Sequence, residues 1–132
     1  MRVFFDHNLS HTLPEALQAI FPHEHEIVAL EKKFPRTISD IDWITALNQE
    51  GHWIVVSGDL RITRNRAERQ VFRSSKLTGF FLAPALKKAR VLKQLERLCA
   101  LWDNIIMLAG AAAPGALYEL PIKTTSPRQL RL

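Results

Sequence analysis

The stretch WIVVSGD, residues 53–59, is the clearest strand signal in the chain. Its run of β-branched and aromatic residues is typical of a strand that is buried on both faces of a parallel sheet. Gly51 precedes it at the position of a left-handed helix cap, and residues 40–50 before that glycine carry apolar side chains at helical spacing. A helix leading directly into a buried strand indicates an α/β fold.

The alternation of strands and helices continues in both directions from this stretch. We predict further strands at residues 3–6, 27–30, 79–82 and 117–122. We predict the other helices from about Leu13 to Ile20, from Asn65 to about Ser75, and from Pro84 to the break at residues 110–115. Ser10, Ser39 and Asn65 are the expected N-caps. Right-handed βαβ units of this kind build a three-layer α/β/α fold with a central, mostly parallel sheet of four to five strands.

The length and composition suit one globular domain. A chain of 132 residues buries roughly two-thirds of its unfolded surface, and 47% hydrophobic against 23% charged residues excludes a disordered chain. We assign residues 1–122 to this domain and residues 123–132 to a basic, loosely held tail. Cys99 lies in an apolar helical pattern, so we expect a small buried core residue there.

No membrane or secretory segment is expected. The longest apolar stretch, residues 98–114, is interrupted by Asp103 and Asn104 and is shorter than the roughly 20 residues that a spanning helix needs. The chain opens on a strand-like run without the charged lead of a secretory signal. We therefore expect a cytoplasmic protein with no membrane partner.

The charge balance favours a polyanionic partner. Eighteen lysines and arginines stand against thirteen acids, which gives a net charge of +5, and such a balance suits RNA, DNA or an acidic protein. Positive charge is concentrated in residues 61–97. A solvated helix face is the structural alternative. The residues that we expect to contact nucleic acid are Arg61, Arg64, Arg66, Arg69 and Arg73.

Two aspartates stand at the ends of predicted strands. Asp6 and Asp59 follow strands that lie parallel in one sheet, so their loops emerge at the same edge. Asp40 opens a helix that is entered from that edge. Clustered carboxylates raise one another's pKa, and a hard cation such as Mg²⁺ or Mn²⁺ is the usual reason to keep them together. A metal ion held there activates water and stabilises charge on a phosphodiester, so we predict phosphodiester hydrolysis.

Each of these residues also has a structural interpretation. Asp6 and Asp59 are good turn formers, and Asp40 stabilises the start of a helix through the macrodipole. His7 and His11 are either acid–base groups or partly exposed polar residues, and we favour the second. We expect His23 and His25 at the surface, and we assign Trp43, Trp53 and Trp102 to the core. Ser57 lacks the surroundings of a serine nucleophile.

Three segments together resemble the PIN-like nuclease domains, which include the VapC-type toxins. They are VFFDHNLS (residues 3–10), SDID (residues 39–42) and VVSGD (residues 55–59), and the similarity spans residues 1–85. The resemblance implies a metal-dependent ribonuclease that uses Mg²⁺ or Mn²⁺. Its three metal-binding, catalytic acids match Asp6, Asp40 and Asp59. Asp42 is a further candidate ligand, and Asn8 and Ser57 are the supporting residues.

Two positions depart from the family pattern. His7 stands where a Glu is expected, and Leu60-Arg61 stands where a further acid often follows. Three functions therefore remain open: a ribonuclease, plausible as the toxin of a toxin–antitoxin pair; a weak or inactive module that binds RNA or an acidic protein; and a phosphatase. A receiver-like domain is a poor match, because Lys87 and Lys88 are badly placed for its lysine. The partners implied are RNA and an antitoxin protein, and a homodimer is left open.

Overall fold

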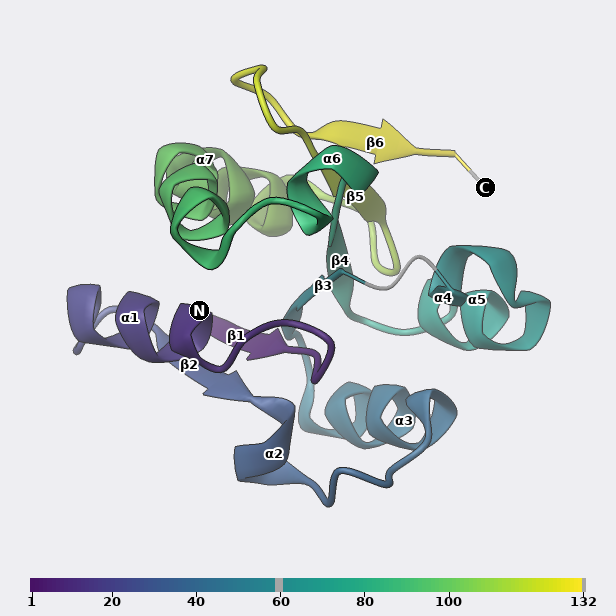
Figure 1. Ribbon diagram of the computed structural model, residues 1–132. Coiled ribbons are helices and arrows are strands. Elements are labelled where there is room, and N and C mark those ends of the chain that lie inside the picture. Colours follow the sequence, from purple (N-terminus) through teal and green to yellow (C-terminus); the bar gives the residue numbers. More distant parts are fainter. Residues whose placement is uncertain (59–60, 132) are drawn as a thin grey trace.

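The computed structural model describes residues 1–58 and 61–131, with the backbone alone for Arg61. Its strands are β1 (Arg2–Phe5), β2 (Glu26–Ala29), β3 (Ile54–Ser57), β4 (Thr78–Leu82), β5 (Leu117–Leu120) and β6 (Arg128–Leu130). They form one sheet in the order β2-β1-β3-β4-β5-β6 (Figure 1). The first five strands run parallel, and β6 pairs antiparallel with β5. The strand order reverses at β1, where the chain passes from β2 on one side to β3 on the other.

Helices cover both faces of this sheet (Figure 1). The described helices are α1 (Thr12–Ile20), α2 (Leu30–Lys33), α3 (Asp40–Glu50), α4 (Arg61–Arg64), α5 (Arg66–Arg73), α6 (Pro84–Lys87) and α7 (Val91–Ala111). Helices α1, α6 and α7 contribute to one buried apolar cluster, and α2 to α5 contribute to the other. The predicted three-layer α/β/α fold is confirmed.

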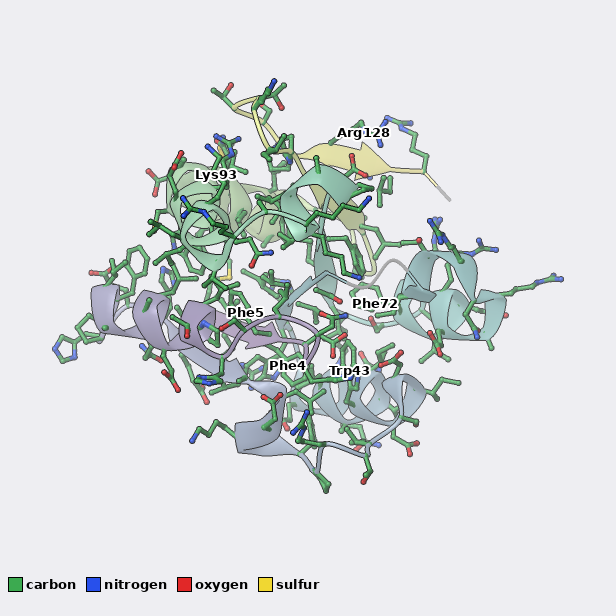
Figure 2. All side chains as sticks on the ribbon, viewed as in Figure 1. Phe4, Phe5, Trp43, Phe72, Lys93 and Arg128 are labelled. Carbon is green, nitrogen blue, oxygen red and sulfur yellow. The ribbon has the colours of Figure 1, made fainter. Side chains whose placement is uncertain are left out.

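Strand residues alternate between these two clusters, as the twofold repeat of a β-strand requires. Phe5 packs into the cluster under α1 and α7, while Phe4 packs against Trp43 of α3 with ring centroids 4.9 Å apart. Figure 2 shows Phe4 and Phe5 on opposite sides of β1. Both are 0–1% exposed, and burying a side chain of this kind contributes about 1.5–3 kcal/mol. The central strands are therefore buried on both faces, as predicted.

The expected signals around α3 are confirmed. The Ser39 hydroxyl accepts a hydrogen bond from the Asp42 N–H over 3.1 Å, so Ser39 is the N-cap. Gly51 ends the helix with φ +114°, a conformation that a side chain disfavours. The Asn65 side chain caps α5 in the same way, accepting from the Glu68 N–H over 3.1 Å. All three predicted tryptophans are buried in the core.

Three local predictions were wrong. Ser10 is not the N-cap of α1, because its hydroxyl accepts from the Thr12 N–H and the cap position falls on His11. The long helix predicted from Pro84 is divided into α6 and α7. The Gln94 amide lies at this break and donates to the carbonyls of Leu86 and Lys87, which end α6. Cys99 is exposed, because its neighbour Leu98 takes the core position of the helical repeat.

The C-terminal tail is attached more firmly than the sequence suggests. Its residues 128–130 form β6, a sixth strand beyond the four to five predicted. The Arg97 guanidinium of α7 donates to the carbonyls of Pro121 and Thr124, and the Asn104 amide donates to that of Thr125. These bonds hold the connection between β5 and β6 against α7. Within the described residues, no helix is both long enough and apolar enough to cross a membrane.

Candidate active site at the carboxyl end of the sheet

Asp6 is a buried carboxylate at the end of the central strand β1. Its backbone N–H donates to the Val56 carbonyl over 3.0 Å, which continues the pairing of β1 with β3 by one residue. The residue is only 2% exposed. Its Oδ1 accepts a hydrogen bond from the His7 N–H at 2.7 Å and lies 2.8 Å from His7 Nδ1. The fold thus fixes the carboxylate at the point where ligands bind in open parallel sheets.

Ser57 and Asn8 connect Asp6 to the end of β3. The buried Ser57 hydroxyl donates to Asp6 Oδ2 over 3.1 Å. Asn8 lies in the loop after β1; its amide nitrogen donates to Ser57 Oγ at 3.4 Å, and its oxygen accepts from the Gly58 N–H at 3.1 Å. These bonds hold together the loops after β1 and β3. The two predicted supporting residues therefore lie beside Asp6.

Asp40 reaches the same edge from the first turn of α3. Ser39 caps this helix, and Asp40 Oδ1 accepts a hydrogen bond from the Trp43 indole N–H at 2.9 Å. Because Trp43 is fully buried, this bond orients the carboxylate. The negative charge of Asp40 contributes to raising the pKa of Asp6.

Burial is the main cause of the raised pKa of Asp6. Removing water penalises the charged carboxylate, and the charge of Asp40 adds to this effect. The hydrogen bond from the His7 backbone and the nearby imidazole lower the pKa and oppose the shift in part. No lysine or arginine with a described side chain forms an ion pair with Asp6. Among the described groups, those that lower the pKa of Asp6 therefore do not fully offset its burial and the charge of Asp40.

The other two acidic candidates have different outcomes. Asp59 follows Gly58 directly in the sequence but lies outside the described residues. Asp42 is exposed on the first turn of α3, and its backbone N–H serves the Ser39 cap. Among the residues that the structure describes, no group of three His, Cys, Asp or Glu side chains is arranged to hold a metal ion. The structure thus places two of the three predicted acids, Asp6 and Asp40, at one edge of the sheet.

The histidines differ partly from expectation. His7 is half-buried, and it contacts Asp6 directly, which its position next to a strand-end aspartate could have indicated. His11 is exposed and lies 3.2 Å from a carboxylate oxygen of Glu15. The prediction that His25 lies at the surface was wrong. Its ring packs against Phe21 and Trp102, with ring centroids 5.1 and 5.6 Å away. Burial lowers the pKa of His25. His23 is exposed, as expected.

The predicted nucleic-acid contacts lie on α4 and α5, which follow β3. Arg64, Arg66 and Arg73 are exposed. Arg69 is partly buried, and its guanidinium donates to the Thr63 carbonyl over 3.2 Å. The side chain of Arg61 lies outside the described residues. Arg64, Arg66 and Arg73 thus present positive charge to solvent on the segment that leaves β3.

The donor chemistry of this edge fits a hard divalent cation. Asp6 and Asp40 offer carboxylate oxygens, which are the ligands preferred by Mg²⁺ and Mn²⁺. A cation beside them would offset the burial and repulsion that raise the pKa of Asp6. Asp42, by contrast, is exposed, and its backbone N–H donates to the Ser39 cap. The arrangement is therefore suited to chemistry on a phosphate group, where a bound cation neutralises developing negative charge.

Among the comparisons with known proteins, one with family models gave a match. A family model described as a PIN like domain matches residues 1–84. This segment contains β1 to β4 and includes Asp6, Asn8, Asp40 and Ser57. No curated protein and no solved structure gives a significant match. PIN-like domains are generally nucleases, and they usually use divalent metal ions. The chain belongs to the PIN-like domain family.

Proposed function

We propose that this protein is a Mg²⁺- or Mn²⁺-dependent ribonuclease that hydrolyses phosphodiester bonds at the edge marked by Asp6. The observation that carries the proposal is the buried Asp6 carboxylate, which has Asp40 nearby and no lysine or arginine partner among the described side chains. Burying an uncompensated charge costs stability, and functional sites are where proteins retain such groups. Membership of the PIN-like family supports nuclease chemistry for this site.

Asp6 and Asp40 are the proposed protein ligands, with Asp59 as the third carboxylate. When bound, the cation would activate water and stabilise negative charge on the scissile phosphate. The chain's own residues prepare this site. Ser57 and Asn8 hold Asp6 in place at the ends of β1 and β3, and the Trp43 indole holds Asp40. Fixed ligands of this kind reduce the cost of reorganisation on binding.

The arginines of α4 and α5 supply the countercharge for RNA in this proposal. They are Arg61, Arg64, Arg66, Arg69 and Arg73. Positive side chains near the site bind the phosphate backbone without reading its sequence. We further propose the role of a toxin with an antitoxin protein as partner, which membership of a nuclease family supports.

A cleavage assay tests the ribonuclease proposal. We expect the protein to cleave single-stranded RNA with Mn²⁺ or Mg²⁺ and to lose this activity with EDTA. Asp6→Asn and Asp40→Asn should each abolish cleavage, whereas the control Asp103→Asn should not, because Asp103 is exposed on α7. Equal cleavage by Asp6→Asn would exclude the proposed site. Turnover of p-nitrophenyl phosphate with indifference to RNA would instead identify a phosphatase.

One observation favours a weak or inactive RNA-binding module as a second candidate. Both His7 Nδ1 and the His7 N–H lie within hydrogen-bond distance of Asp6 Oδ1, at 2.8 and 2.7 Å, where a cation would compete for the same oxygen. The module would bind RNA while showing no Mn²⁺ binding by calorimetry at millimolar concentration. His7→Glu separates the two candidates, because it restores the acid expected at this position and should raise the activity of a weak nuclease.

A further inference from the structure

A groove of about 700 Å³ opens beside the acidic edge, between α1, the end of β2 and the start of α2. Its volume lies within the range of about 300–1,000 Å³ that is usual for small-molecule sites. His7 belongs to both places, because it lines the groove and contacts Asp6 Oδ1. A molecule in the groove would therefore lie next to a phosphate held at Asp6. None of the metal-binding, supporting or nucleic-acid-binding residues predicted from the sequence lines this groove.

The floor of the groove is apolar and its rim is polar. Leu9, Pro14 and Ile27 are buried side chains that line it, together with Val28 and Ala29 of β2. Ser10, His11 and Lys32 are polar lining residues. This combination suits a flat ligand with a stackable face and a polar edge, rather than a fully polar ligand.

The charges of the lining residues argue against a groove that binds only the phosphate backbone of RNA. Lys32 and Arg36 line the groove, but so do the carboxylates of Glu15 and Glu31, so the formal charges of these four residues cancel. A path for a phosphate backbone would need an excess of cations, as on α5. A nucleobase is uncharged, and its donors and acceptors can pair with side chains of either sign.

An added β-strand is a poor occupant, although β2 is at the edge of the sheet. Strand addition requires free backbone groups along the edge. The Gln18 side chain lines the groove and already accepts the Ile27 N–H over 2.8 Å. Its amide nitrogen also donates to the carbonyls of Phe21 and His25, so Gln18 is fixed in this position. The edge is blocked at Ile27.

We infer that this groove receives one unpaired nucleobase of the RNA strand whose phosphate lies at Asp6, and that it gives the protein a preference for single-stranded RNA. The inference rests on the proposed ribonuclease function. A base enters such a groove only when it is free of its pairing partner and its stack, which a duplex does not allow without an unpairing cost. The imidazoles of His7 and His11 offer faces on which a base can stack.

Nucleotide binding tests where the base lies. The probe is adenosine 5′-monophosphate added to ¹⁵N-labelled full-length protein carrying Asp6→Asn, without metal, so that no cleavage occurs. We expect amide shifts concentrated at Leu9, Ser10, Val28 and Ala29, which line the groove. Inorganic phosphate should leave these amides unchanged. Equal shifts with phosphate alone, or shifts confined to α5, would overturn the inference.

A blocking substitution tests single-strand preference in the same Asp6→Asn background. Ser10→Trp places a large ring in the groove, and we expect it to weaken binding of a single-stranded RNA about ten-fold, as expected for loss of one base contact. Ala19→Trp is the matched control, because Ala19 is exposed on α1 and does not line the groove. Binding of a blunt-ended RNA duplex, which has no unpaired base, should not change in either variant. Unchanged single-strand affinity in a folded Ser10→Trp variant would overturn the inference.

The two proposals fail in different ways. Nucleotide binding in the groove without metal-dependent cleavage by the wild type would retain the base site and exclude the nuclease. Cleavage that depends on Asp6 but is unaffected by Ser10→Trp, with no nucleotide-induced shifts at the groove, would retain the nuclease and exclude the base site.

Discussion

Ser57 donates a hydrogen bond to the Asp6 carboxylate over 3.1 Å, and so joins the ends of β3 and β1. Both residues are buried, at 0% and 2% exposure. A hydrogen bond to a buried carboxylate favours its charged form, which is the form that binds a cation. Ser57 therefore acts on the proposed metal site through Asp6, as a positioning residue.

Ser57→Ala should raise the pKa of Asp6 further and weaken both Mn²⁺ binding and cleavage, by roughly ten-fold. The loss of one buried hydrogen bond should also cost about 1 kcal/mol of stability. Ser75→Ala is the matched control, because Ser75 is also buried and donates to the Phe72 carbonyl. It should cost similar stability and leave Mn²⁺ binding unchanged. Calorimetry and chemical denaturation measure both quantities; equal Mn²⁺ affinities in the two variants would contradict the role of Ser57.

Asp6→Asn should stabilise the metal-free protein. The folded-state pKa of Asp6 is raised, so this residue favours folding when protonated and loses that contribution as the pH rises through its folded pKa. At pH 7 the amide removes a buried, repelled charge, and we expect a melting temperature higher by roughly 2–6 °C, about 1 kcal/mol at this size. The gain should shrink as the pH falls through this raised pKa, because the wild-type carboxyl then becomes protonated. A less stable variant at pH 7 would contradict this account.

Ser39→Ala tests whether the N-cap of α3 supports the proposed metal site. The Ser39 side chain caps α3, and Asp40 is the first residue of that helix. Loss of the cap should cost about 1 kcal/mol and loosen the position of Asp40. Asn65→Ala removes the corresponding cap of α5 and should cost similar stability. Only Ser39→Ala should weaken Mn²⁺ binding; a parallel loss in both variants would show that the effect is global.

The imidazole of His25 should make the protein less stable in mild acid. Its pKa is lowered by burial against Phe21 and Trp102, so the folded state favours the neutral ring. This contribution is present above the unfolded pKa of about 6.5 and is lost as the pH falls below it. Denaturation between pH 8 and 5 should show the free energy of unfolding falling with pH.

Replacing His25 tests the origin of this slope. His25→Gln should reduce the dependence of stability on pH, and the exposed control His23→Gln should not. Some slope should remain, because burial and Arg2 also lower the pKa of His52. An unchanged slope in His25→Gln would contradict the assignment.

The sequence predicts the sheet and two of its acids because those features depend on local patterns. Continuous apolar runs identify strands that are buried on both faces, and a residue at the end of such a strand must lie at the carboxyl edge. The cap at Ser39 and the helix over residues 40–50 depend on neighbouring residues alone, and both are confirmed. Asp6 and Asp40 were predictable for these reasons.

The features that the sequence did not predict depend on contacts between distant segments. Strand β6 is defined by pairing with β5 and by bonds from Arg97 to the connecting carbonyls. The break before α7 involves Gln94, whose side chain bonds to the preceding helix. The groove is built from α1, β2 and α2 together, so no single motif marks it. Leu98 and Cys99 are neighbours in α7, and both are apolar. The sequence alone therefore does not show that Leu98 is the buried one and Cys99 the exposed one.

The most direct test of the proposed metal site is the melting temperature with and without Mn²⁺, measured for the wild type, Asp6→Asn and Asp40→Asn. A ligand that binds only the folded state raises its stability in proportion to RT ln(1 + [L]/Kd). We predict that millimolar Mn²⁺ raises the melting temperature of the wild type and of the control Asp103→Asn, and leaves both site variants unchanged. An equal rise in all four proteins, or no rise in the wild type, would contradict a cation site at Asp6 and Asp40.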